Sequence, residues 1–286
     1  MSSICFNGKI MPADEPVLLA SNRGYRYGDG LFETIKVSKG QILFAGDHFE
    51  RLFDGLSLLR FEIPALFTKE KLIPEILRLC EKNGCEELAR IRLSVSRGYG
   101  GLYDTDRRLN WLIECWALNN SVNKLNENGL ITGIYPDARK SCDPFSNLKS
   151  ANFLPYSMAA QYAKENKWND CLVLNTNGTI TDSTIANVFI IKEGIIFTPA
   201  LTEGCIAGIM RKNILGWLRR KGYTITETAL SVRDIENADE LFLTNAINGI
   251  RWVARCGESS YTHTKTQEIH TGFAKTIPPE LHETHC

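Results

Sequence analysis

The sequence has no excess charge of either sign, since its 286 residues contain 33 Lys and Arg and 33 Asp and Glu. Balanced charge gives no electrostatic reason to expect nucleic acid or an anionic membrane as a partner. Long hydrophobic runs are also missing, because no apolar stretch approaches the ~20 residues of a membrane span. The first residues, MSSICFNGKIMPADE, lack the basic-then-apolar pattern of a signal peptide. We therefore expect neither nucleic acid nor membrane as partner.

Paired cysteines and clustered histidines are missing too. The nine cysteines include no CxxC pair, and the five histidines are scattered. Zinc sites usually show such paired or clustered ligands, so we expect no metal. An odd number of unpaired cysteines is typical of free thiols in a reducing compartment, and we expect a cytoplasmic protein.

The first third of the chain mixes strand and helix patterns. "ICFNGKIM" predicts a hairpin with Asn7-Gly8 at its turn, and "LFETIKVSKGQILF" predicts a second hairpin. Residues 47–61 then place apolar side chains on one helical face, and the spacing of Asp47 and Glu50 predicts a capping box at the helix start. A second helix is expected over 68–83.

Period-two patterns follow in "RIRLSVSR" and "LNWLIECWAL", which predict two strands. The next segment, 119–129, is polar, rich in Asn and without periodicity, so it is interpreted as a linker. The second half repeats the mixture of patterns, with a strand at "LITGIYP", a helix to about Glu165, a hairpin at "NVFIIKEGIIFTPA" and a helix ending at Gly222. The tail predicts one more helix and a polar terminus.

These elements define the expected organisation. They favour an α+β (α/β) protein of two domains built around mostly antiparallel sheets. We expect an N-terminal α+β domain over 1–118, the linker 119–129 and a C-terminal domain over 130–286.

Lys149 is the one charged residue in the otherwise uncharged stretch "SNLKSANFLPYS". A lysine attacks a carbonyl only as the neutral amine, which apolar neighbours or nearby cations favour. A strand-to-helix junction flanked by apolar side chains suits that requirement. Taken alone, however, the pattern is weak and is more typical of a surface lysine.

A phosphate site is suggested by "GIMR" at 208–211, where a helix start would expose the N–H groups of Ile209 and Met210. The loop after "LTNAI" could add donors, and Arg51 is a surface charge unless it turns toward a phosphate. The alternative to a phosphate site is that Gly208 is needed only because another segment of backbone passes close to it.

Three further residues carry an open choice between function and ordinary structure. Asp182 either forms a turn or pairs with the ring nitrogen of a cofactor. Arg97, after a strand and before a Gly-rich loop, either clamps a substrate carboxylate or is a surface charge. Arg92 presents the same choice, and the pattern favours a surface charge.

The order of these segments resembles one family. "RGYRYGDGLFETIKV", "HFERLFDGL", "SRGYGG", "NLKSAN", "TDSTIANVF", "GIMR" and "DELFLTNA" together are similar to the class IV aminotransferases, the fold-type IV enzymes of pyridoxal 5′-phosphate (PLP). The resemblance covers residues from about 4 to 255. It implies a small N-terminal domain, a larger barrel-like C-terminal PLP-binding domain, and a homodimer.

The resemblance also implies residue roles. Lys149 stands where the family has its Schiff-base lysine, which also carries the proton at the reacting carbon. Phe32 and Arg97 match positions near the substrate, with Arg92 as a further substrate-binding candidate. The positions that bind PLP correspond to Arg51, Asp182, Ile209, Met210, Asn245 and Ala246.

The chain departs from the transaminase pattern at three places, of which Asp182 is the one that would suit a non-catalytic relative. Asp182 replaces the usual Glu, Met210 replaces the usual Thr, and Asn245 with Ala246 replaces Ser or Thr. "GIMR", "SRGYGG" and the "NA" after the last strand look more like 4-amino-4-deoxychorismate lyase, which forms 4-aminobenzoate and pyruvate. The alternatives are an amino-acid transaminase for branched-chain or D-amino acids with 2-oxoglutarate as acceptor, and a non-catalytic relative.

Overall fold

The computed structural model describes residues 2–104 and 106–277. The chain forms two compact units: residues 2–120 together with Lys149–Asn152, and residues Ser121–Leu148 together with 153–277. Each unit is described by itself. The short segment Lys149–Asn152 belongs to the first unit although its sequence neighbours belong to the second.

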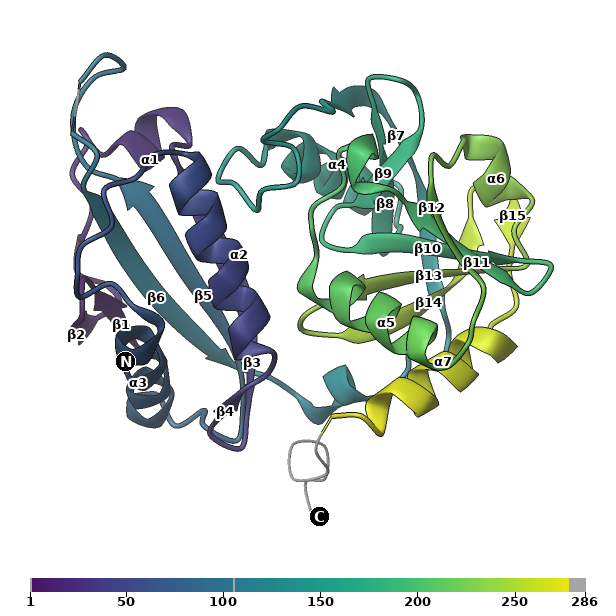
Figure 1. Cartoon of the computed structure of the whole chain (residues 1–286), viewed down its shortest axis with the longest axis horizontal. Helices are drawn as coiled ribbons and strands as arrows, with labels where there is room; N and C mark the ends of the chain where they lie inside the picture. The colour runs from purple at the N-terminus through teal and green to yellow at the C-terminus, as the bar shows by residue number, and fades with distance from the viewer. Residues whose placement is uncertain (1, 105, 278–286) are drawn as a thin grey trace. The chain divides into compact units, whose positions relative to one another are not determined.

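The first unit is a six-stranded sheet with three helices (Figure 1). Every pair of neighbouring strands is antiparallel, in the order β2-β1-β6-β5-β3-β4. Its elements are β1 (Ser3–Phe6), β2 (Lys9–Pro12), α1 (Arg23–Tyr27), β3 (Gly30–Ser38), β4 (Gln41–Ile42), α2 (Ala45–Leu58), α3 (Lys69–Lys82), β5 (Leu88–Arg97) and β6 (Leu109–Ala117).

Both predicted hairpins are present in this unit. Asn7 and Gly8 have φ of 47° and 82°, and Lys39 and Gly40 have φ of 47° and 70°. Two successive residues with positive φ match the turn that suits the twist of a two-residue hairpin. The Asn-Gly and Lys-Gly pairs therefore define where these strands reverse.

The predicted capping box of α2 is wrong. The helix begins at Ala45, two residues before Asp47, and its N-cap is Phe44, which has a left-handed backbone (φ 53°) and makes no side-chain cap hydrogen bond. The helix starts here because the chain leaves β4 at Leu43, whose N–H donates to Lys36 O. Asp47 lies in the first turn, where a carboxylate interacts favourably with the helix dipole.

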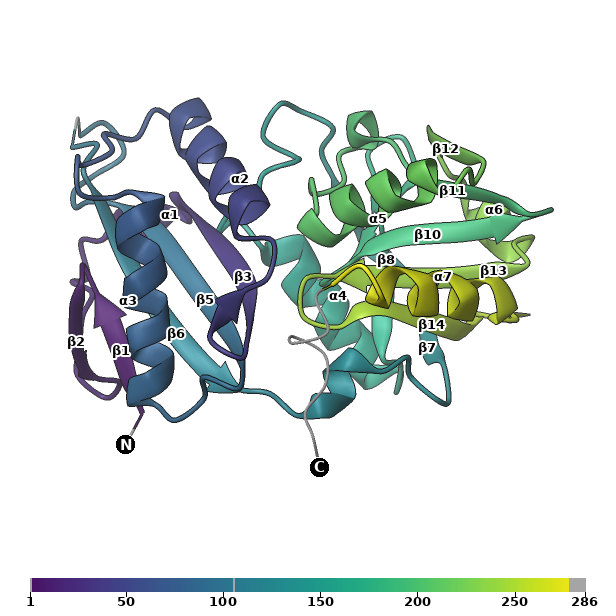
Figure 2. The same ribbon diagram turned by 60° about the horizontal axis from the view of Figure 1, so that its bottom comes forward.

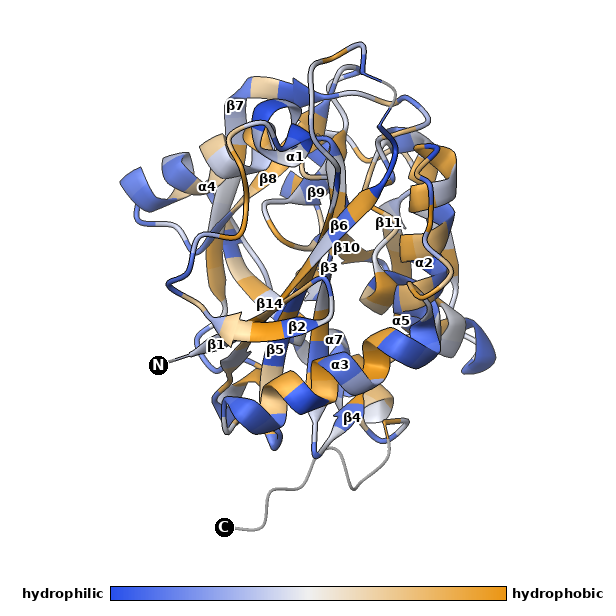
Figure 3. Ribbon diagram, turned by 90° about the vertical axis from the view of Figure 1, so that its left-hand side faces the viewer, coloured by the Kyte–Doolittle hydropathy of each residue, from blue (hydrophilic) through white to orange (hydrophobic). Residues whose placement is uncertain are grey.

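One face of this sheet is covered by α2 and α3. Alternate strand residues form a cross-strand row in which Ile35 pairs with Ile91 and Ile91 with Cys115. Phe49 and Leu52 of α2 are buried, and along α2 and α3 apolar and hydrophilic segments alternate, as in amphipathic helices (Figure 3). Since successive strand residues face opposite sides, even-numbered residues of β3 project away from these helices.

The second unit is built on a nine-stranded sheet. Strands β10, β13, β14, β7, β8 and β9 follow one another, and β9 pairs with β10 at Asp182 and Asn187, which closes a barrel-like ring. The strands are β7 (Leu130–Lys140), β8 (Asp170–Asn175), β9 (Ile180–Ser183), β10 (Asn187–Lys192), β11 (Ile195–Pro199), β12 (Ile225–Thr228), β13 (Glu240–Asn245), β14 (Gly249–Cys256) and β15 (Ser259–Ser260).

Helices pack on this sheet at separate places. Helices α5 and α7 lie side by side (Figure 2), with Trp217 and Phe273 in edge contact at 6.0 Å between ring centroids. Helix α4 packs on β7 and β8 through Tyr156 and Ala159. The helices are α4 (Leu154–Glu165), α5 (Ile209–Arg220), α6 (Val232–Glu236) and α7 (Thr264–Ala274), with 3₁₀ turns at Asn120–Asn123 and Leu201–Glu203.

The predicted fold class, α+β with a barrel-like second sheet, is confirmed. The helix predicted in the tail is α7, whereas His282 and His285 lie outside the described residues. None of the helices within residues 2–104 and 106–277 combines the length and the apolar composition of a membrane span.

Candidate active site

Lys149 is held at the edge of β3 by its own backbone. Its carbonyl accepts a hydrogen bond of 2.9 Å from the N–H of Phe32, and Ala151 N–H donates to Gly30 O at 2.9 Å. Leu31 and Ser150 form an antiparallel bridge between these bonds. The segment after Lys149 therefore extends the sheet by a short strand, which fixes the lysine backbone more firmly than a surface loop would.

The Lys149 side chain lies against the ring of Phe32. Its Nζ is 4.6 Å from the ring centroid, and the lysine is half-buried. The guanidinium carbon of Arg92 is 3.9 Å from the same centroid, and Arg92 Nε donates to Ser94 Oγ at 3.0 Å. Burial lowers the pKa of Arg92. The structure thus brings together three sequence candidates: an amine, a guanidinium and the aromatic ring that both contact.

Arg51 lies on the other face of the sheet, in a buried cluster. Its guanidinium makes two hydrogen bonds to Glu33, of 2.8 Å from Nε and 2.5 Å from a terminal nitrogen, and His48 Nδ1 lies 2.7 Å from the same carboxylate. Burial raises the pKa of Glu33, but the Arg51 charge and the hydrogen bonds from His48 and Arg51 outweigh it, so that the pKa falls to about 2. Glu33 therefore fixes the orientation of Arg51.

Arg97 is placed apart from the Phe32 ring. Its Nε donates to Asp29 at 2.9 Å, and its terminal nitrogens donate to Leu59 O at 2.7 Å and Arg60 O at 3.2 Å. Arg23 shares the Asp29 carboxylate. In this arrangement Arg97 ties the end of β5 to the end of α2, and a substrate carboxylate would compete with these contacts.

In the second unit, the start of α5 forms a cradle for an anion. Gly208 is the N-cap, and the first-turn N–H groups of Ile209 and Met210 have no acceptor within the helix. A Cβ at Gly208 would clash with Asn187 Oδ1, so any larger residue there would have to displace the Asn187 side chain. The positive end of the helix dipole adds to the attraction for a phosphate.

Asp182 is a buried acceptor at the point where the ring of strands closes. Its carboxylate accepts hydrogen bonds from Tyr156 OH at 2.7 Å, Asn187 Nδ2 at 2.9 Å and Ile206 N–H at 3.0 Å. Lys140 Nζ lies 3.3 Å away. A carboxylate offers about four lone-pair directions, so these donors already occupy most of the capacity of Asp182.

Tyr156 and Lys140 are residues that the sequence reasoning missed. Burial and the neighbouring Asp182 charge raise the pKa of Tyr156 well above its ordinary value, so that its hydroxyl stays a donor. A signal existed in the sequence, because Tyr156 lies in the first turn of the helix that follows the Lys149 segment. The pairing of Lys140 with Asp182 spans 42 residues and has no local signal.

The loop after β13 is organised by the Asn245 side chain. Its Oδ1 accepts hydrogen bonds from Ile247 N–H at 3.1 Å and Asn248 N–H at 2.8 Å. Asn245 and Ala246 are half-buried. The carboxamide oxygen of Asn245 therefore shapes the turn in which Ala246 sits.

Comparisons with known proteins agree on one family. The family described as "Amino-transferase class IV" matches residues 30–256. A putative branched-chain-amino-acid aminotransferase of Methanocaldococcus jannaschii is 30% identical over 84% of this chain and 83% of its own length. Aminodeoxychorismate lyase of Vibrio harveyi is 28% identical over 80% and 83%, and D-alanine aminotransferase of Bacillus licheniformis is 27% identical over 85% and 84%.

A solved structure supports the fold. The branched-chain amino acid aminotransferase of Escherichia coli superposes with a TM-score of 0.87 at 21% identity, over 98% of this chain and 95% of that one. The chain belongs to the class IV aminotransferases and is an enzyme that depends on PLP. The glycine cradle and free amides at the start of α5 fit the phosphate of such a cofactor.

Proposed function

We propose that this enzyme is a 4-amino-4-deoxychorismate lyase in which Lys149 is the catalytic base. The observation that carries the base assignment is the contact of Lys149 Nζ with the buried Phe32 ring, beside Arg92. A base must be held within reach of one carbon–hydrogen bond. The backbone bridge to β3 and the ring contact hold this amine at both ends.

The other residues bind and orient. We assign the phosphate of PLP to the amides of Ile209 and Met210, with the loop at Asn245 and Ala246 as a further contact. Arg51, which stands at the phosphate arginine of the family, is the proposed additional partner; Glu33 holds part of its guanidinium on the other face of the sheet from Phe32, so binding would use its remaining N–H groups. Bound there, PLP supplies an electron sink for the pair released at the substrate carbon. Asp182, held by its donors, is the proposed partner of the ring nitrogen.

The reaction balances without an added oxidant or reductant. Lys149 takes the proton from the ring carbon that bears the amine, and the bond from the neighbouring carbon to the enolpyruvyl oxygen breaks. The leaving group departs as the enolate of pyruvate, which regains one proton, the one that Lys149 removed or one from water, to become pyruvate. The six-membered ring becomes aromatic as 4-aminobenzoate. Arg92, close to Lys149 at Phe32, is the proposed partner of a substrate carboxylate.

The support for the lyase comes from the phosphate side. Met210 is buried and offers no hydroxyl, and the Asn245 oxygen serves its own turn. Met210, Asn245 and Ala246 thus offer no hydroxyl, and the proposed donors of both segments are mainly backbone amides, as expected for the lyase-like motifs. The similarity to the Vibrio harveyi lyase supports the same choice.

An amino-acid transaminase is the second candidate. It is supported by the 30% identity to the Methanocaldococcus jannaschii protein and by the D-alanine aminotransferase relatives. Lys149 would then return the proton to the cofactor rather than assist an elimination. Both reactions need the same base, so substrate shape must separate them.

Parallel assays on the purified enzyme decide between the two. One follows 4-aminobenzoate and pyruvate from aminodeoxychorismate; the other follows glutamate from 2-oxoglutarate with leucine or D-alanine. We expect the first to be fast, and Lys149→Ala to reduce it by at least ~10²-fold. Glutamate formation with aminodeoxychorismate left untouched would refute the lyase.

A borohydride experiment tests the non-catalytic alternative. Reduction of the PLP-loaded protein should attach the cofactor to Lys149, as mass spectrometry of peptides would show. An unmodified Lys149 would mean that the protein is a relative without catalytic activity.

The family also suggests a homodimer, which light scattering can test. The free thiols of the described residues suit a reducing cytoplasm.

A further inference from the structure

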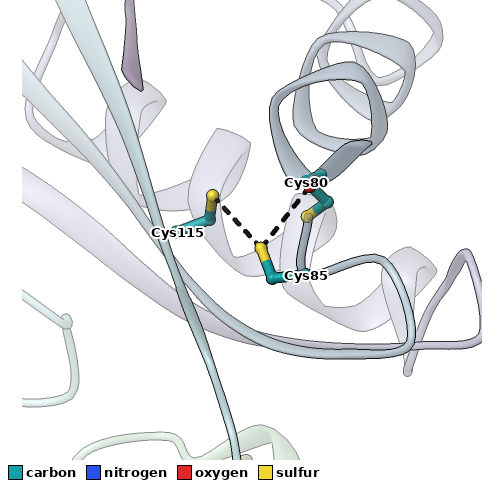
Figure 4. Close-up of side chains that lie close together, drawn as sticks. All are labelled: Cys80, Cys85 and Cys115. Atoms are coloured by element: carbon teal, nitrogen blue, oxygen red, sulfur yellow. Dashed lines mark hydrogen bonds between the residues drawn. The ribbon is translucent and has the colours of Figure 1, made fainter. Parts of the chain in front are cut away.

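Three cysteines of the first unit meet in its core. They come from the last turn of α3, from the loop that follows it and from β6, and all three are buried. Their sulfur atoms lie within 4.8 Å of one another, with 3.6 Å between Cys85 Sγ and Cys115 Sγ (Figure 4). The third sulfur belongs to Cys80. The cluster lies on the helix-covered face of the sheet, away from Lys149 and Phe32.

The backbone builds this cluster. Gly84 has φ of 64° and ends α3, and Cys85 N–H then donates to Cys80 O at 3.0 Å. This return of the chain brings Cys85 beside Cys80. Asn83 fixes the third member, because its Nδ2 lies 3.0 Å from Cys115 Sγ and also donates to Ser3 O at 2.8 Å.

The spacing of the sulfur atoms suits one metal ion. Zinc–sulfur bonds of about 2.3 Å place sulfur atoms ~3.8 Å apart in a tetrahedral site and ~4.0 Å apart in a trigonal one. The distance of 3.6 Å between Cys85 Sγ and Cys115 Sγ lies just below both values, and the other two sulfur–sulfur distances are at most 4.8 Å. Small rotations of the side chains would equalise them.

Charge favours a divalent ion. Three thiolates around a monovalent cation would leave two negative charges buried, whereas a divalent cation leaves one. The Asn83 amide already donates toward Cys115 Sγ, an interaction that suits a thiolate more than a thiol. Among the described residues, no His, Asp or Glu joins the group, so sulfur supplies the side-chain ligands.

We propose that Cys80, Cys85 and Cys115 bind one thiophilic divalent cation of the zinc type in a three-thiolate site. The ion ties the end of α3 to β6 and serves structure, since it lies on the opposite face from Phe32. The sequence pattern alone does not point to this site, because its ligands do not form an adjacent cysteine pair. These ligands are instead separated by a helix end and a strand.

The first test measures metal on the whole protein. Because the cluster is buried, metal should enter during folding. We would replace the exposed Cys142, and Cys286 outside the described residues, with Ser, unfold the reduced protein, and refold it with and without Cd²⁺. We expect one Cd²⁺ per chain, a thiolate-to-metal charge-transfer band and a Tm raised by several degrees.

Variants locate the ligands. Cys80→Ser, Cys85→Ser and Cys115→Ser should each weaken Cd²⁺ binding by more than ~100-fold, beyond the effect of a change outside the ligand sphere. Cys5→Ser is the matched control, since Cys5 is buried in the same sheet but outside the cluster. It should keep one Cd²⁺ per chain.

Two results would overturn the proposal, and both use the parent protein, in which only Cys142 and Cys286 are replaced and all three cluster cysteines remain. One is a refolded parent protein that binds no Cd²⁺ at a stoichiometric ratio and shows no charge-transfer band. The other is a parent protein, purified without chelator, that carries no zinc and holds a Cys85–Cys115 disulfide by mass spectrometry. Circular dichroism of each variant separates lost ligands from lost folding.

Discussion

Replacement of Glu33 by Gln tests the buried cluster that orients Arg51. In the native protein the pKa of Glu33 falls from an ordinary value of 4.5 to about 2, because Arg51 and His48 outweigh its burial. At 1.36 kcal/mol per pKa unit, the charged carboxylate contributes about 3 kcal/mol to stability at neutral pH. Glu33→Gln should lower the free energy of unfolding by about this amount, since it leaves a buried guanidinium without its carboxylate.

The pH dependence of the free energy of unfolding provides a second test of the contact between Glu33 and Arg51. A depressed native pKa gives stability that is complete above about pH 4.5 and is lost as pH falls toward 2. Denaturant unfolding of wild type should show this loss, and Glu33→Gln should flatten it. Glu87→Gln, an exposed change in the same unit, is the control. If Glu33→Gln is as stable as Glu87→Gln and keeps the wild-type pH profile, the assignment is wrong.

The remaining predictions concern the start of α5, the proposed substrate contact of Arg92 and the hydrophobic core of the second unit. Gly208→Ala should weaken PLP binding by at least ~10-fold in an absorbance titration, because its Cβ clashes with Asn187 and disturbs the free amides. Gly216→Ala in the same helix has room and should bind PLP normally while gaining ~0.5–1 kcal/mol of stability. Arg92→Gln should raise KM by ~10–100-fold with a smaller change in kcat, since it removes a charged hydrogen bond to substrate; an unchanged KM would contradict this. Phe189→Ala should cost ~3–5 kcal/mol in denaturant unfolding, because the ring is fully buried and stacked on another phenylalanine at 4.9 Å; a loss below ~1 kcal/mol would refute the packing argument.

Local chemistry accounts for the parts of the fold that the sequence predicts well. Asn7-Gly8 and Lys39-Gly40 give hairpins because few residues adopt positive φ easily, and Gly in second place does so at no steric cost. The prediction for the start of α2 is wrong because that start is not decided by local sequence. A capping box is a local signal, whereas the helix begins directly after the β3–β4 hairpin, with Phe44 as its N-cap.

The candidate site depends on contacts that no local pattern contains. Lys149 looks like any lysine until its carbonyl meets Phe32 N–H, more than a hundred residues earlier in the chain. The resemblance to a family identifies Lys149 as the candidate Schiff-base lysine, and the structure shows which residues surround it. The same holds for Lys140 and Asp182, whose pairing needs β7, β8 and β9 to be adjacent.

The sequence around Glu33 contains a pattern from which its buried contacts can be predicted. In "LFETIKV" the residues at 31, 35 and 37 are apolar with period two, and Glu33 interrupts that row. A carboxylate in the core-facing row of a strand is costly unless a cation meets it. The following helix offers His48 and Arg51, three residues apart and so on one face. The row, the carboxylate and the helical spacing together predict the buried cluster that the structure contains, and the same reading applies to any strand whose apolar alternation is broken once by a charge.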